Sequence, residues 1–150
     1  MRLIVPETTM RTIRAEAEAG HPHEVCGFLL GSRRGGERVV GEALPAANQR
    51  TDSAADRYRI DADAYRAVER EADRSGAEIL GFYHSHPDAP ARPSEYDREH
   101  AWPSVAYLIV SVREGEAGET TAWRLAEDRS DFESIELEIP VEEENRCPTS

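Results

Sequence analysis

The sequence contains no lysine, and its 18 Lys-or-Arg positions are all arginine. Aspartate and glutamate together number 30, which gives a formal net charge of −12 at pH 7. A surface this acidic repels phosphate groups, and this argues against nucleic acid as a partner. The composition is typical of adaptation to high salt, and codon bias in a GC-rich genome explains it equally well.

Cysteine and long apolar runs are also scarce. Cys26 and Cys147 are too few for a disulfide framework. No apolar run approaches the length of a membrane span, and the segment from Met1 to Pro6 is too short for a secretory signal. We therefore expect a cytoplasmic protein that is not anchored in a membrane.

The length of 150 residues suits one domain with a proper hydrophobic core. Mixed strand and helix signals predict an α/β chain of the α+β type. Its single mixed, mostly antiparallel sheet would be flanked by helices. We expect this domain to span residues 1–140, with a disordered acidic tail at 141–150.

Short apolar runs and apolar alternation predict the strands, and runs of good helix formers predict the helices. The predicted strands are 2–5, 25–30, 38–44, 78–83, 105–112, 120–125 and 132–139, with a further short strand at 58–60. The predicted helices are 7–19, 62–75 and 94–102. Residues 45–57 are expected to form a loop, residues 105–112 the centre of the sheet, and residues 132–139 an edge strand.

The most informative stretch runs from His84 to Asp97. His84 and His86 end an apolar run, and side chains at i and i+2 of a strand point to the same face. Three prolines then impose a loop, after which Ser94 can cap a helix that turns Asp97 back toward the strand end. Two imidazoles and one carboxylate form the three-ligand set of catalytic zinc, whose fourth position is open to water.

A metal-dependent hydrolase also needs a base beside its water, and Glu24 is the candidate. It lies at the mouth of the apolar segment 25–30, where a carboxylate without a partner is costly. Zinc lowers the pKa of bound water toward about 7. Glu24 can then accept the proton during attack on a carbonyl and deliver it to the leaving amine. Ser94 can donate a hydrogen bond to the developing oxyanion.

Glu24 heads a Glu-Xaa-Cys-Gly-Phe-Leu-Leu-Gly segment, and the motifs His84–Pro87 and Ser94–Asp97 follow in order. This pattern resembles the JAMM/MPN family of zinc metallopeptidases, and its short prokaryotic branch in particular. The match extends from the first strand to about residue 126. The resemblance implies a fold with a cytidine-deaminase-like layout, Zn²⁺ on His84, His86 and Asp97, and catalytic roles for Glu24 and Ser94.

Members of that branch cleave after the Gly-Gly tail of ubiquitin-like or sulfur-carrier proteins, and the resemblance implies such a carrier as the partner. Residues 45–57 correspond in position to an insertion that contacts the tail in relatives. Asp97 and Val105 are too close in sequence for the second insertion of eukaryotic linkage-specific deubiquitinases. Three cleavage reactions stay open. The enzyme could release an amino acid such as cysteine from the end of the carrier, trim a carrier precursor, or remove the carrier from a target lysine.

Each part of the pattern has a simpler explanation. Ser94 and Asp97 can form only a capping box, a His-Xaa-His pair arises by chance, and Glu24 can be a surface carboxylate. All of these would have to hold together in the observed order, so the metal site is the favoured hypothesis. Cys26 either approaches the zinc or is a small buried side chain. The alternative function is a non-catalytic JAMM/MPN-type scaffold, but such members typically lack one or more ligands.

Overall fold

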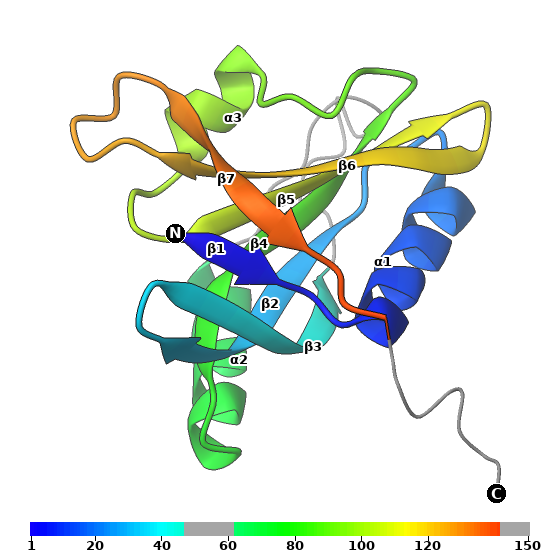
Figure 1. The fold of residues 1–150 in the computed structure, drawn as a ribbon. Coiled ribbons are helices and arrows are strands. Elements are labelled where there is room, and N and C mark those ends of the chain that lie inside the picture. Colours follow the sequence, from blue (N-terminus) through cyan, green and yellow to red (C-terminus); the bar gives the residue numbers. More distant parts are fainter. Residues whose placement is uncertain (47–61, 142–150) are drawn as a thin grey trace, which may run out of the picture.

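The computed structural model describes residues 1–46 and 62–141, in which strands close into one barrel flanked by helices (Figure 1). The order around the barrel is β1-β3-β2-β4-β5-β6-β7. The bounds of the strands are β1 Arg2–Ile4, β2 Cys26–Arg34, β3 Glu37–Ala46, β4 Glu78–Pro87, β5 Ala106–Arg113, β6 Glu116–Leu125 and β7 Phe132–Glu138. The helices within these residues are α1 Glu7–Gly20, α2 Ala62–Arg74 and α3 Glu95–His100.

The expected mixed sheet with flanking helices is confirmed, but the sheet closes on itself. The prediction of an edge strand at 132–139 is wrong, because β7 pairs antiparallel with β6 and parallel with β1. Strand β1 also pairs with β3, and Arg2 forms ion pairs with Glu37 on β3 and Glu138 on β7. An alternating pattern indicates that one face of a strand is buried, but it does not reveal how many neighbours the strand has.

Strand β4 lies in the best-protected part of the fold. It pairs with β2 on one side and with β5 on the other. The strand predicted at 105–112 is present as β5 and is buried from Ala106 to Val112, although a closed barrel has no central strand. Tyr83 belongs to the apolar cluster that also contains Met10 of α1. Phe82 belongs to a second apolar cluster, which also contains Ala72 of α2. Because successive side chains point to opposite faces, β4 is anchored from both sides.

Strand β3 continues through Pro45 and Ala46, two residues that the sequence placed in a loop. Proline is tolerated there because β1 pairs with β3 only over 37–39, so no described strand lies on the other side of Pro45. The rest of that predicted loop, the short strand predicted at 58–60 and the tail from residue 142 lie outside the described residues. Among the described helices, none has the length and apolar character needed to span a bilayer.

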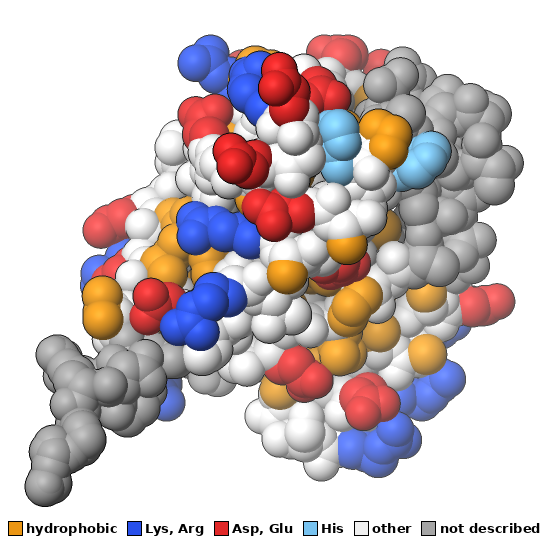
Figure 2. Space-filling model, turned by 90° about the vertical axis from the view of Figure 1, so that its right-hand side faces the viewer, with side chains coloured by type: hydrophobic (Ala, Val, Ile, Leu, Met, Phe, Trp, Pro, Cys, Tyr) orange, Lys and Arg blue, Asp and Glu red, His pale blue; other side chains and the backbone are white. Residues whose placement is uncertain are grey.

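The surface agrees with the acidic composition. On the described part of the face in Figure 2, Asp and Glu side chains are spread among arginines rather than separated from them. The negative charge is therefore distributed over this face rather than gathered in one patch.

Candidate metal centre and catalytic site

The two histidines of the site lie within β4, which extends further than the predicted strand 78–83. His84 and His86 are two residues apart on β4, so their rings lie on the same face, with Nε2 atoms 3.1 Å apart. His84 is 1% exposed and His86 is 7% exposed. Pairing with β2 and β5 fixes the backbone of β4 and therefore the directions of both rings.

Asp97 reaches the histidines from the first turn of α3. The Ser94 hydroxyl accepts a hydrogen bond from the Asp97 N–H (3.1 Å), and Asp97 Oδ2 accepts one from the Ser94 N–H (2.8 Å). This is a capping box. The same Oδ2 lies 3.2 Å from His86 Nε2 and 3.4 Å from His84 Nε2. Capping and metal binding are therefore not alternatives here, because the cap holds the carboxylate against the two rings.

The three ligand atoms form a triangle with sides of 3.1, 3.2 and 3.4 Å. A tetrahedral zinc with bonds of about 2.0–2.1 Å to nitrogen and oxygen keeps its ligand atoms about 3.3 Å apart. The spacing and the donor set of His84, His86 and Asp97 therefore fit zinc with one position left for water. No other group of metal-binding side chains of this kind occurs within residues 1–46 and 62–141.

The electrostatics of the cluster favour a bound cation. Burial lowers the pKa of His84, against the opposing charge and hydrogen bond of Asp97, and so favours the neutral imidazole that can bind a metal. Burial alone would raise the pKa of Asp97. The electrostatic attraction of His84 and the hydrogen bonds from His84, His86 and the Ser94 N–H outweigh burial and hold that pKa below its ordinary value. A neutral ring next to an ionised carboxylate is what a divalent metal requires.

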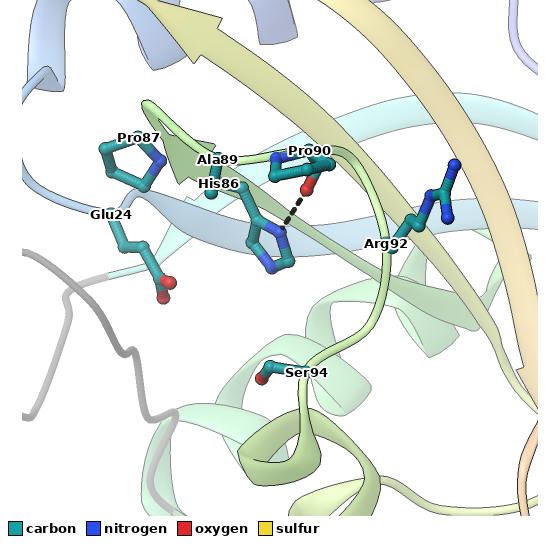
Figure 3. Close-up of a pocket in the computed structure, with 7 residues that line it drawn as sticks. All are labelled: Glu24, His86, Pro87, Ala89, Pro90, Arg92 and Ser94. Carbon is teal, nitrogen blue, oxygen red and sulfur yellow. Dashed lines mark hydrogen bonds between the residues drawn. The ribbon is translucent and has the colours of Figure 1, made fainter.

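Glu24 lies two residues before β2 and is 6% exposed. Its carboxylate, the His86 ring and the Ser94 hydroxyl all face one cavity of about 290 Å³ (Figure 3). Pro87, Ala89 and Pro90 line another side of this cavity. The structure therefore brings together all of the candidate side chains that the sequence predicted, from three separate segments of the chain.

Ser85 connects these segments, a role that sequence reasoning missed. It lies between the two histidines on β4, and it points to the opposite face. Its hydroxyl accepts a hydrogen bond from the Val25 N–H (2.9 Å), and its own N–H donates to the Val25 carbonyl (3.0 Å). Two hydrogen bonds thus join Val25, which follows Glu24, to Ser85, which lies between His84 and His86.

Residues 6–126 match the family of prokaryotic homologs of the JAB domain. This match covers most of the chain. The chain belongs to the prokaryotic JAB family. Within it, the chain is similar to the desampylase of Haloferax volcanii, at 36% identity over 65% of this chain and 69% of the relative. It is also similar to a probable TtuB-protein conjugate cleaving protease of Thermus thermophilus, at 35% identity over 73% of this chain and 70% of the relative.

Solved structures resemble this chain over nearly all of its length. The solution structure of protein DSY2949 from Desulfitobacterium hafniense has a TM-score of 0.81 at 28% identity and covers 96% of this chain and 97% of its own. The JAB1/MPN domain protein AF2198 from Archaeoglobus fulgidus has a TM-score of 0.56 at 21% identity, over 93% and 97% of the two chains, and supports the fold alone. With the named relatives, the JAB match identifies the chain as a JAMM-type hydrolase.

Cys26 of this JAB domain is not part of the metal-binding group. It is the register partner of His84, yet its thiol lies 3.8 Å from the Ala46 carbonyl and is fully buried. Burial, with the charges of Glu16 and Glu24, raises the pKa of the thiol to about 12. A protonated, buried thiol behaves as a small apolar side chain.

We expect native Cys26 to resist alkylation. In the variant Cys147→Ser, which removes the only other cysteine of the sequence, iodoacetamide at pH 8 should leave the folded protein unmodified. The thiolate is the reactive form, and a pKa of about 12 leaves a thiolate fraction on the order of 10⁻⁴ at that pH. Intact-mass spectrometry should detect one adduct only after unfolding in guanidinium. Rapid labelling of the folded protein would contradict both the burial and the raised pKa.

Proposed function

We propose that this JAB-family protein is a zinc-dependent hydrolase. It would cleave the peptide or isopeptide bond after the Gly-Gly tail of a ubiquitin-like or sulfur-carrier protein. The observation that carries the proposal is the convergence of Glu24, His86 and Ser94 on one cavity beside the triangle of metal-binding atoms. A scaffold protein would need neither the base nor the complete set of ligands.

The side chains divide the chemistry between them. When bound, zinc would activate a water molecule and polarise the scissile carbonyl. Glu24 would accept a proton at its carboxylate and return it to the leaving amine. The Ser94 hydroxyl accepts the Asp97 N–H, so its own hydrogen remains available for the substrate carbonyl oxygen as negative charge develops there. Burial of Glu24 strengthens these interactions, since water screens them weakly.

The cavity also supports the proposed substrate class. Pro87, Ala89 and Pro90 form an apolar wall of the cavity (Figure 3). An extended chain can approach such a wall closely only where its own side chains are absent, and glycine meets that requirement. Only seven residues separate Asp97 from Val105, which leaves no room for an insertion that would recognise a particular ubiquitin linkage. The relative from Thermus thermophilus is named as a probable protease that cleaves TtuB-protein conjugates.

The test is a cleavage assay read by intact-mass spectrometry. Zinc-loaded protein is mixed with a Gly-Gly-tailed carrier that bears a C-terminal cysteine, a short peptide or an isopeptide-linked lysine, each in a separate reaction. We expect cleavage after the terminal glycine in at least one reaction, and the mass of the product identifies the leaving group. A carrier with a Gly-Ala tail is the matched substrate control and should be cut much more slowly.

The outcomes separate the two candidate functions. Cleavage that stops when a chelator removes the metal would support the hydrolase. No cleavage with zinc fully bound would direct the search to a different acyl substrate. No cleavage together with no zinc binding would favour the non-catalytic scaffold.

A further inference from the structure

The segment 88–94 connects β4 to α3 and carries a contact on which the metal centre depends. The Pro90 carbonyl lies 2.9 Å from His86 Nδ1. A carbonyl can only accept, so Nδ1 must hold the ring proton of the neutral imidazole. The lone pair of His86 is then on Nε2, the atom that faces His84 and Asp97. The place of one backbone carbonyl therefore selects the tautomer that can bind a metal.

Two hydroxyl groups of the barrel hold this segment on either side of Pro90. Ser111 Oγ on β5 donates to the Ala89 carbonyl, and Thr121 Oγ1 on β6 donates to the Ala91 carbonyl, both at 2.6 Å. Ser111 is 2% exposed and is the register partner of His86 across the β4–β5 pair. Both strands therefore present hydroxyl groups to the segment that folds over them.

Trp123 determines which way the Thr121 hydroxyl points. The indole nitrogen can only donate, and Trp123 Nε1 lies 2.8 Å from Thr121 Oγ1. The hydroxyl must therefore accept from the indole, and its single hydrogen is directed to the Ala91 carbonyl. Pro90 itself has no N–H with which to attach to the barrel. The hydroxyl contacts thus restrain the backbone that Pro90 cannot anchor.

We propose that Ser111 and Thr121 are positioning residues for the metal centre, with Trp123 orienting Thr121. They hold the backbone around Pro90 so that its carbonyl keeps His86 in the tautomer with Nε2 free for the metal. This inference rests on the proposed metal site, but not on the identity of the substrate. Neither hydroxyl lies among the side chains that line the catalytic cavity.

The test measures zinc affinity directly, by competition with a chromophoric chelator, on the whole chain. Thr121→Val keeps the shape of the side chain and removes the hydroxyl. Loss of a group that orients a ligand typically weakens metal binding by 10- to 100-fold. We expect a loss of about 10-fold for Thr121→Val, approaching about 100-fold when Ser111→Ala is added. Thr121→Ser restores the hydroxyl and should restore zinc affinity.

Thr120→Val is the matched control, because the half-buried Thr120 hydroxyl donates to the Gly118 carbonyl (3.2 Å) and accepts from Arg14 (3.4 Å), both away from the segment around Pro90. It should leave zinc affinity unchanged. Urea unfolding of each metal-free variant shows whether Thr121→Val merely destabilises the fold. The proposal is overturned if Thr121→Val binds zinc as the parent does, if Thr120→Val is equally weakened, or if Thr121→Ser fails to restore affinity. A parent protein that binds no zinc would overturn the metal site as well.

Discussion

Glu24→Gln is expected to lower kcat by about 10²- to 10⁴-fold, the usual contribution of a general acid–base group. Glutamine has nearly the same shape as glutamate, so the buried position should remain filled, but the amide cannot take up a proton. Zinc affinity should stay close to that of the parent protein, because Glu24 does not belong to the triangle of His84, His86 and Asp97. The measurements are steady-state kinetics on the cleavable carrier and the zinc content of the purified variant.

Glu99→Gln is the matched control for charge. Glu99 is exposed on α3, two residues beyond Asp97, and its replacement removes the same charge near the site. It should leave kcat within about twofold, since surface substitutions are usually mild. If Glu24→Gln kept more than a tenth of the activity, another group would have to move the proton. If it lost zinc, Glu24 would be binding the metal rather than acting as the base.

The metal centre could be predicted because its geometry is local. His84 and His86 follow the two-residue repeat of a strand, and Asp97 follows from the helix cap at Ser94. Both relations can be recognised from the spacing of residues in the sequence. Glu24 is different, since no local rule connects it with residues sixty positions away. It became a candidate because it lies just before a buried strand and because it matches the JAMM/MPN pattern.

The features that the sequence did not reveal depend on the register between distant strands. Ser111 donates to the Ala89 carbonyl only because β4 and β5 pair in parallel, with Ser111 beside His86. The closure of the barrel depends likewise on β1, a strand of three residues that joins β3 to β7. Short strands and single hydroxyl groups carry almost no periodic signal. Their roles follow from which side chains the complete fold places next to one another.

Gly81→Ala is expected to be the most damaging small substitution in the barrel. A Cβ atom on Gly81 would lie 1.9 Å from the carbonyl oxygen of Ala106, and 2.7 and 2.8 Å from the Ala106 carbonyl carbon and nitrogen. These are backbone atoms of the register partner on β5, so no side-chain rotation can relieve the clash. Overpacking in a core typically costs 1–3 kcal/mol, occasionally more. For a clash with backbone we expect a loss of about 3 kcal/mol or more in the free energy of unfolding.

The displacement should also reach the metal centre, because Gly81 lies three residues before His84 on the same strand. If β4 moves away from β5, the triangle of ligand atoms opens and zinc affinity falls together with stability. Urea unfolding and chelator competition measure the two effects. Gly118→Ala is the matched control: it is also a strand glycine, but a Cβ there would meet nothing within 4 Å, so its effect should stay within about 0.5 kcal/mol. Equal stabilities of the two variants would mean that β4 and β5 do not approach as closely as their register requires.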